Sequence, residues 1–199
     1  MFAKFASIFA IPELRQKIWI TVILLAVSRI GFSIPLPFVD QREMNKPLAT
    51  GGLGQLLQYV SMFSGGDLSH ATIFGLGIAP YITASIIFMI LGSVYPPLAE
   101  LRKEGMAGQR KINEYTRYAT VLFCLMQGYF YVSYLMSPDQ LGWSISGYNT
   151  FFFRMVMILI MTTGGLFLMW IGEQIDEYGI GNGISLIIMA GIVSRLPAA

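Results

Sequence analysis

The sequence predicts an all-α membrane protein that crosses the bilayer five times. Hydrophobic residues fill 55% of its 199 positions, and the mean hydropathy is +0.62. Only 12% of the residues are charged, about half the share found in soluble domains. Five apolar stretches approach the roughly 20 residues that a helix needs to span the hydrocarbon core. These observations exclude an ordinary soluble domain.

The apolar stretches alternate with polar or glycine-rich connections. In chain order, we expect spans at residues 18–37, 75–94, 118–137, 151–171 and 184–199. The connecting segments are residues 1–17, 38–74, 95–117, 138–150 and 172–183. Arg29 in the first span should face protein or an interface, because an arginine at the bilayer centre costs about 2.5–3.5 kcal/mol. The fifth stretch is incomplete as a span and runs into Arg195 and Pro197.

The distribution of basic residues predicts the orientation. One set of segments carries eight of them: Lys4, Arg15, Lys17, Arg102, Lys103, Arg110, Lys111 and Arg117. The opposite side has only Arg42 and Lys46. The positive-inside rule therefore places the N-terminus and the 95–117 connection in the cytosol, together with the acidic 172–183 connection. The first twenty residues lack a small-residue cleavage site and are interpreted as a retained cytosolic segment.

The external connection, residues 38–74, is long and dotted with glycine. It contains LLQYVSMFSGGDL, an apolar run too short to span the membrane. One interpretation is a re-entrant half-helix that dips inward, which requires surrounding protein or a water-filled cavity. The other is a surface loop with a short amphipathic helix.

The segment GEQIDEYGIGNGIS, residues 172–185, separates the last two apolar stretches. Its alternating glycines resemble a dinucleotide fingerprint, but that motif needs a preceding strand inside a βαβ unit. Here the preceding segment is a predicted spanning helix. We therefore expect a cytosolic turn, with Asn182 as the N-cap of a helix that begins at Gly183.

Two isoleucine pairs have helical spacing. Ile184 and Ile188 share one face of the last helix, and Ile78 and Ile82 share a face near the start of the second span. Such pairs are common in ordinary helix packing. They could also form a shared apolar constriction between helices that enter the membrane from opposite sides.

Catalysis and metal binding are not expected. The single cysteine, Cys124, and the single histidine, His70, exclude an intramolecular disulfide and a His- or Cys-rich metal cage. No nucleophile–base–acid set and no carboxylate pair occurs within the spans, so we predict neither an enzyme nor a cofactor. A net charge of +2 gives no sign of direct nucleic-acid binding.

The 95–117 connection, ELRKEGMAGQRKINEYTRY at its centre, carries mixed charge. It could serve only as the cytosolic anchor that sets orientation. It could also be a docking platform for a cytosolic partner, with Arg102, Lys103, Arg110 and Lys111 as the contact residues.

Four strings together resemble the N-terminal half of the SecY family of protein-conducting channels. They are SRIGFSIPLP, MFSGGDLSHATIFGLGIAPYITASII, LAELRKEGMAGQRKINEYTRYAT and MWIGEQIDEYGIGNGISLIIMAGIV, in the family's order and over nearly the whole chain. The resemblance implies five helices that form one half of an inverted-repeat channel with a re-entrant plug helix. It implies a bacterial inner-membrane protein that passes unfolded secretory polypeptides and signal peptides, and that releases apolar segments into the lipid bilayer. Partners similar to SecE and SecG are expected, with the motor ATPase SecA or a ribosome as the source of force.

The resemblance also assigns site residues. Ile78, Ile82, Ile184 and Ile188 match four positions of the family's hydrophobic pore ring. The plug that closes the resting pore would include Met62, Phe63, Ser64, Gly65, Gly66 and Leu68. The lateral gate would be lined by Thr83, Ile86, Ile87 and Ile90 on the opposite face of the second span, together with the third span.

Three positions depart from the family pattern. Phe38 stands where a glycine is usual, Met89 where a glutamine is common, and His70 where an arginine is frequent. These departures concern the energetics of the gate and the anchoring of the plug.

Two rival classes remain distinguishable. A secondary-transporter half would need a polar substrate cluster near the midplane, and none is visible in the spans. A membrane insertase would need a hydrophilic groove, for which Arg29, Thr162 and Thr163 are the few polar groups available.

Overall fold

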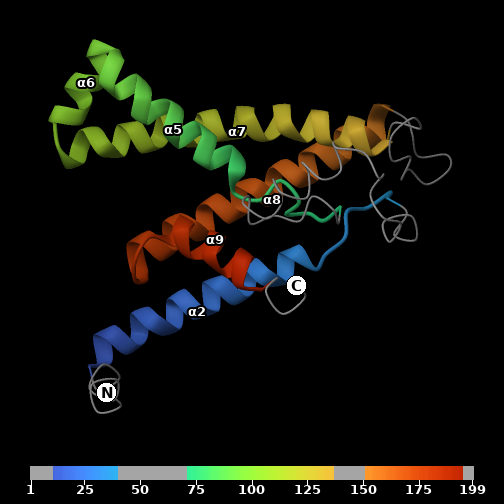
Figure 1. The fold of residues 1–199 in the computed structure, drawn as a ribbon, viewed down its shortest axis with the longest axis horizontal. Helices are drawn as coiled ribbons and strands as arrows, with labels where there is room; N and C mark the ends of the chain where they lie inside the picture. Colours follow the sequence, from blue (N-terminus) through green and yellow to red (C-terminus); the bar gives the residue numbers. More distant parts are fainter. Residues whose placement is uncertain (1–10, 40–70, 137–150, 195–199) are drawn as a thin grey trace.

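The computed structural model describes residues 11–39, 71–136 and 151–194. Within them the helices are α2 (Pro12–Phe32), α5 (Ala79–Val94), α6 (Pro96–Lys103), α7 (Met106–Met136), α8 (Phe151–Tyr178) and α9 (Gly183–Val193). Figure 1 shows α7 and α8 running side by side, α5 and α6 beside the start of α7, and α9 beside α2. The chain is all-α in this part, as the sequence predicts.

Helix α2 begins and ends earlier in the chain than the predicted first span. α2 begins with Pro12 in its first turn and ends at Phe32, so it starts before residue 18 and stops before residue 37. Proline at the first turn lacks only an amide that a helix leaves unpaired anyway. Pro35 then bars the helix from continuing and instead forms an isolated antiparallel bridge with Thr72.

The predicted connection 95–117 is largely helical. α5 and α6 meet at a bend of 97° between Val94 and Pro96, where a proline again restricts the backbone before it. α7 then runs without a break from Met106 to Met136, so it contains the whole stretch 106–117 as well as the apolar segment that follows.

α7 and α8 are each long and apolar enough to cross a membrane. The bent pair of α5 and α6 would raise the number of candidate spans in the described residues to three. α2 has four charged residues among its 21, namely Glu13, Arg15, Lys17 and Arg29, and α9 is a shorter apolar helix. The count of five spans stays a prediction.

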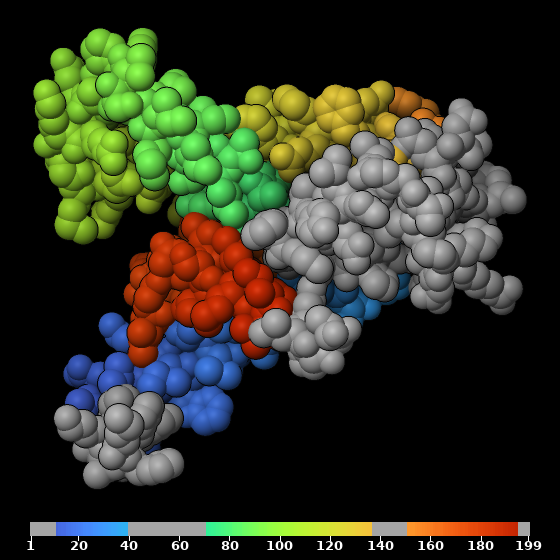
Figure 2. All heavy atoms as spheres, in the orientation of Figure 1, coloured from blue at the N-terminus to red at the C-terminus, as the bar shows by residue number. Residues whose placement is uncertain are grey.

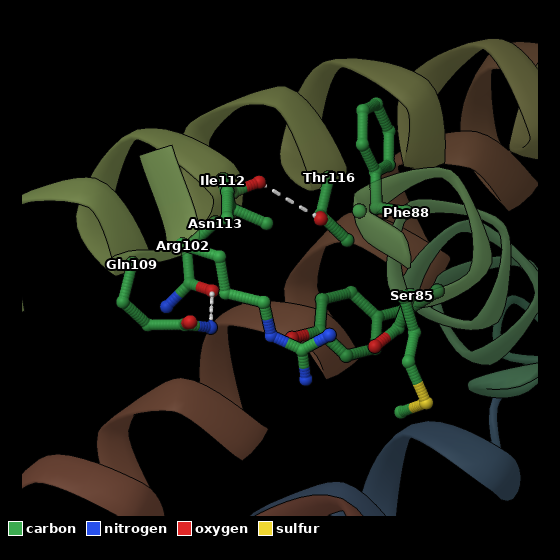
Figure 3. A pocket seen from close by; sticks show the side chains of 10 residues that line it. Ser85, Phe88, Arg102, Gln109, Ile112, Asn113 and Thr116 are labelled. Carbon is green, nitrogen blue, oxygen red and sulfur yellow. Dashed lines mark hydrogen bonds between the residues drawn. The ribbon is translucent and has the colours of Figure 1, made fainter. Parts of the chain in front are cut away.

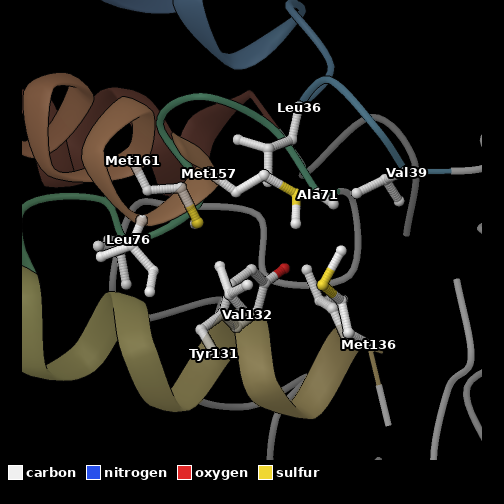
Figure 4. Packing of buried hydrophobic residues seen from close by; sticks show 11 residues of the cluster. Leu36, Val39, Ala71, Leu76, Tyr131, Val132, Met136, Met157 and Met161 are labelled. Atoms are coloured by element: carbon white, nitrogen blue, oxygen red, sulfur yellow. The ribbon is translucent and has the colours of Figure 1, made fainter. Parts of the chain in front are cut away.

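One buried cluster joins the far ends of α7 and α8 to the two segments that flank residues 40–70 (Figure 4). Its members are Leu36, Val39, Ala71, Leu76, Tyr131, Val132, Leu135, Met136, Met157, Ile158 and Met161. Backbone hydrogen bonds hold the flanking segments together: the Leu36 N–H donates to the Ala71 carbonyl at 2.7 Å, and the Ile73 N–H to the Ile34 carbonyl at 3.1 Å. This core fixes where α5 begins.

Phe38 adopts a left-handed backbone, with φ of +67°. That conformation costs a residue with a side chain roughly 1–2 kcal/mol, which gives a physical reason for the glycine usual at this position in the family. The ring offsets part of the cost. It packs against the buried cluster of Figure 4 and lies 4.9 Å from the Phe153 ring, measured between centroids.

The three connections predicted to be cytosolic lie toward one end of the molecule. In Figure 1 the start of α2, helix α6 and the turn between α8 and α9 all lie toward the left. Figure 2 shows the surface hollowed on that side, between the atoms of α5 and α6 and those of α9. The lengths of α7 and α8 separate this end from the core of Figure 4.

Candidate functional site

An isoleucine cluster lies where the start of α5, the end of α8 and the start of α9 meet. Its buried members are Ile78, Ile171, Ile175 and Ile187. Ile82, Ile184 and Ile188 are partly buried and pack against them. The two isoleucine pairs picked out by their spacing therefore lie in one cluster, although about a hundred residues separate them in the chain.

The four predicted ring residues are not equivalent. Ile82, Ile184 and Ile188 keep part of their surface exposed, as a residue lining a passage must. Ile78 is only 1% exposed and lies behind them against the buried isoleucines. In this structure Ile78 supports the exposed three.

Polar groups of the 172–185 segment set the position of α9. The Asn182 side chain accepts a 2.9 Å hydrogen bond from the Ser185 N–H, which confirms the predicted N-cap. The Asp176 carboxylate accepts a 2.7 Å hydrogen bond from the Gly183 N–H. Two of the amides that the start of a helix leaves unpaired are thus satisfied.

The turn is shorter than the predicted connection 172–183. α8 continues as a helix to Tyr178, and the non-helical part is residues 179–182, with Gly181 at φ of +81°. α8 and α9 touch backbone to backbone here, because a Cβ on Gly183 would overlap the carbonyl oxygen of Gly172. The two glycines let α9 pack directly on α8.

Two further contacts tie this region to the rest of the molecule. The hydroxyl of Thr21 on α2 accepts a 3.1 Å hydrogen bond from the Ile180 N–H. Arg117 on α7 pairs with Glu173 on α8 at 2.7 Å, between Nε and Oε1. Arg117 is half exposed, so the pair contributes little stability by itself.

The predicted lateral-gate residues follow one open side of α5. Ile86 and Ile90 are 48% and 56% exposed, whereas Thr83 and Ile87 are partly buried. The Thr83 hydroxyl donates to the Ala79 carbonyl at 3.0 Å and so is satisfied within the helix. This side of α5 is therefore apolar and uncovered in the described part of the chain.

A polar cavity of about 100 Å³ opens among α5, α6 and α7 (Figure 3). Its lining includes Tyr81, Ser85, Met89, Arg102 and Asn113. Asn113 accepts a 3.3 Å hydrogen bond from Gln109 across one turn of α7. Met89, one of the three departures from the family pattern, thus lines a polar cavity.

The predicted docking residues separate into two groups. All four are exposed on α6 and the first turns of α7, but only Arg102 also lines this cavity. The predicted plug lies wholly outside the described residues, and so does His70. The plug positions are Met62, Phe63, Ser64, Gly65, Gly66 and Leu68.

Sequence reasoning missed three members of the isoleucine cluster. Ile171, Ile175 and Ile187 are its buried centre. Ile171 and Ile175 are four residues apart on α8, the same helical spacing as in the two predicted pairs. Spacing alone does not distinguish them, because it does not show which helices pack together.

Membrane-length helices, an open apolar side on α5 and two isoleucine pairs that meet in one cluster define a polytopic helical membrane protein. The comparisons specify the class: the chain belongs to the SecY family, whose model matches residues 72–199.

Relatives are similar along almost the whole chain. The protein translocase subunit SecY of Escherichia coli K12 is 47% identical over 188 residues, which are 94% of this chain and 42% of the relative. That of Buchnera aphidicola from Acyrthosiphon pisum is 46% identical over 192 residues, 96% of this chain and 43% of the relative. The chain thus spans less than half the length of these relatives.

Solved structures share the fold. A protein-conducting channel superposes with a TM-score of 0.65 at 21% identity, over 91% of this chain and 36% of the other. Sec61 from a canine ribosome–channel complex gives 0.62 at 21% identity, with the same coverage. At such identity the likeness establishes the all-helical channel fold.

Proposed function

We propose that this chain supplies the N-terminal half of a bacterial protein-conducting channel, which passes unfolded secretory polypeptides across the inner membrane. The observation that carries the proposal is the meeting of Ile82 with Ile184 and Ile188 in one partly exposed cluster. These residues come from helices that run in opposite directions through the membrane. Relatives named protein translocase subunit SecY support the same function.

The proposed mechanism needs no binding site for the substrate. Branched apolar side chains form a constriction that excludes water and ions by dewetting, yet they can yield around a passing chain. The cluster behind them, Ile78, Ile171, Ile175 and Ile187, gives the constriction a firm base because its members are almost fully buried. The rest of the ring would come from the other half of the channel.

Lateral release follows from the uncovered side of α5. Ile86 and Ile90 expose apolar surface, and such a surface normally marks a missing interface. We assign this surface, with Thr83 and Ile87, to a gate that opens between the two halves so that apolar segments of the substrate enter lipid. The plug would include Met62, Phe63, Ser64, Gly65, Gly66 and Leu68.

The orientation and partners follow from charge. Seven of the eight basic residues in the cytosolic set fall within described segments, toward the end that holds the start of α2, α6 and the α8–α9 turn. This arrangement supports a cytosolic N-terminus. Arg102, Lys103, Arg110 and Lys111 would then face SecA or a ribosome, and subunits similar to SecE and SecG would complete the complex.

The test is a photo-crosslinker placed at Ile82 or Ile184 in the complete channel, with a stalled secretory polypeptide as substrate. We expect crosslinks from both positions. Leu159 on α8 is the matched control, because it is 58% exposed yet lies away from the isoleucine cluster. Absence of crosslinks at both isoleucines while translocation proceeds would show that the cluster is ordinary packing.

A further inference from the structure

We propose that Arg29 is a positioning residue for the isoleucine constriction. Its guanidinium, on α2, holds the membrane-embedded part of α9 at the rotation that presents Ile184 and Ile188. The inference rests on the proposed channel function. It assigns a role to a charged residue that the sequence marks as costly and that the pore, gate and docking assignments leave unused.

With the α8–α9 turn at the cytosolic edge of the hydrocarbon core, as the proposed orientation has it, two lengths along the helices put Arg29 near the middle of the membrane. The hydrogen bond between Thr21 and Ile180 sets Thr21 level with the α8–α9 turn. Arg29 lies eight residues further along α2, or about 12 Å at 1.5 Å per residue. Ser194, eleven residues after Gly183 along α9, lies about 16 Å from the same turn. A hydrocarbon core about 30 Å thick has its midplane at that depth.

At this depth Arg29 binds α9 at two points. Its Nη1 donates to the Ser194 hydroxyl at 3.1 Å, and the Ser194 hydroxyl donates in turn to the Gly191 carbonyl at 2.9 Å. Its Nη2 lies 3.5 Å from the Ile187 carbonyl oxygen. The guanidinium also stacks over the Phe32 ring, 5.0 Å from its centroid. Charge-assisted bonds of this kind gain strength where water is excluded.

The contacts lie on the flank of α9 next to its ring face. With 3.6 residues per turn, Ile187 and Ser194 share one side of the helix, roughly a quarter turn from the side of Ile184 and Ile188. Ile187 also belongs to the buried centre of the isoleucine cluster. Arg29 can therefore fix the rotation of α9 without entering the passage.

The other end of α9 is held separately. Asp176, Asn182 and the contact between Gly172 and Gly183 fix its start. Those contacts lie about 16 Å from Ser194, and the middle of α9 is held by apolar packing of Ile187 and Gly191. Arg29 adds a directional polar attachment near the inner end of the helix.

The test uses the complete channel with all its subunits. Single cysteines at Ile184, Ile187 and Ile188, in a chain whose Cys124 is replaced, are labelled with a small water-soluble thiol reagent. In the parent channel, positions 184 and 188 should label faster than 187. We expect Arg29→Met to reduce that contrast several-fold and to raise the ion conductance of the resting channel several-fold. Arg15→Met, which removes an equal charge from the exposed start of α2, should do neither.

Ser194→Ala separates positioning from a general need for the charge. It removes the hydroxyl that Arg29 binds but leaves the guanidinium in place, so we expect a smaller change in the same direction. Adding Ser194→Ala to the Arg29→Met channel should change labelling and conductance little further, because both substitutions remove the same contact. Unchanged labelling and conductance in an Arg29→Met channel of normal abundance would overturn the proposal. If that variant does not accumulate, unchanged behaviour of Ser194→Ala overturns it. Crosslinking in the parent channel tests the proposed function independently.

Discussion

The Asp176 carboxylate, in the last turn of α8, accepts a 2.7 Å hydrogen bond from the backbone N–H of Gly183, the first residue of α9. One acidic side chain thus caps the start of the next helix across a turn of four residues. The negative charge also complements the positive end of the α9 dipole. Two of the three acids in this segment are therefore structural: Glu173 pairs with Arg117, and Asp176 orients α9.

Replacing Asp176 by alanine should destabilise the junction of α8 and α9. The Gly183 amide would lose its acceptor, which lowers the free energy of unfolding by about 0.5–1 kcal/mol, the lower part of the range for helix caps. Asp176→Asn keeps an acceptor oxygen and should cost less. The measurement is thermal unfolding of the purified complete channel in detergent. Glu177→Ala, one residue away and exposed, is the control. Equal melting temperatures for the alanine variants at 176 and 177 would contradict the assignment.

At Phe38, glycine should be a more stable replacement than alanine, which is the reverse of the usual order of stability. Alanine removes the ring that contacts Phe153 but keeps the cost of the left-handed backbone. Glycine also loses the ring, but it relieves that cost, roughly 1–2 kcal/mol. We therefore expect Phe38→Gly to unfold at a higher temperature than Phe38→Ala. Val39→Gly and Val39→Ala, at the neighbouring buried position, should show the ordinary order, with glycine the less stable. An ordinary order at Phe38 would rule out the positive φ.

Gly183→Ala should disrupt the packing of α9 on α8. The added methyl would overlap the Gly172 carbonyl oxygen, and backbone cannot turn away as a side chain can. Overpacking of this kind costs about 1–3 kcal/mol. Gly92→Ala on α5 is the matched control, because the nearest atoms to its added methyl belong to the Arg102 side chain at 4.0 Å. Alanine in a helix interior stabilises relative to glycine, so the two variants should shift the melting temperature in opposite directions. A shift of the same sign would show that Gly183 is not a close contact.

Features encoded within a few residues could be read from the sequence. Apolar runs predicted helices in the regions of α2, α5, α7, α8 and α9, because burial in lipid depends on composition over about 20 residues. Asn182 was recognisable as a cap because its partner, Ser185, is three residues away. The four long strings predicted the family, which the match over residues 72–199 establishes.

Features that join distant segments could not be read in the same way. Isoleucines four apart occur on many helices, and only the packing of α5, α8 and α9 shows which of them meet. The same holds for the bond from Thr21 to Ile180 and for the contact of Arg29 with Ser194, each of which joins residues more than 150 positions apart. The sequence shows that such polar groups are present, but not which partner each will reach.

By itself, then, the sequence determined that this protein is helical, lies in a membrane, carries its positive charge mainly on one side, and has the strings of the SecY family. Those properties depend on composition and on residues close together in the sequence, so they can be read without knowing the fold. The tertiary structure decided that α7 continues through its polar start, that Phe38 takes a left-handed backbone, and that Ile82, Ile184 and Ile188 stay partly exposed in one cluster in which Ile78 is buried. These outcomes depend on which helices pack against each other. The packing is decided by the sum of many contacts between residues that are far apart in the sequence.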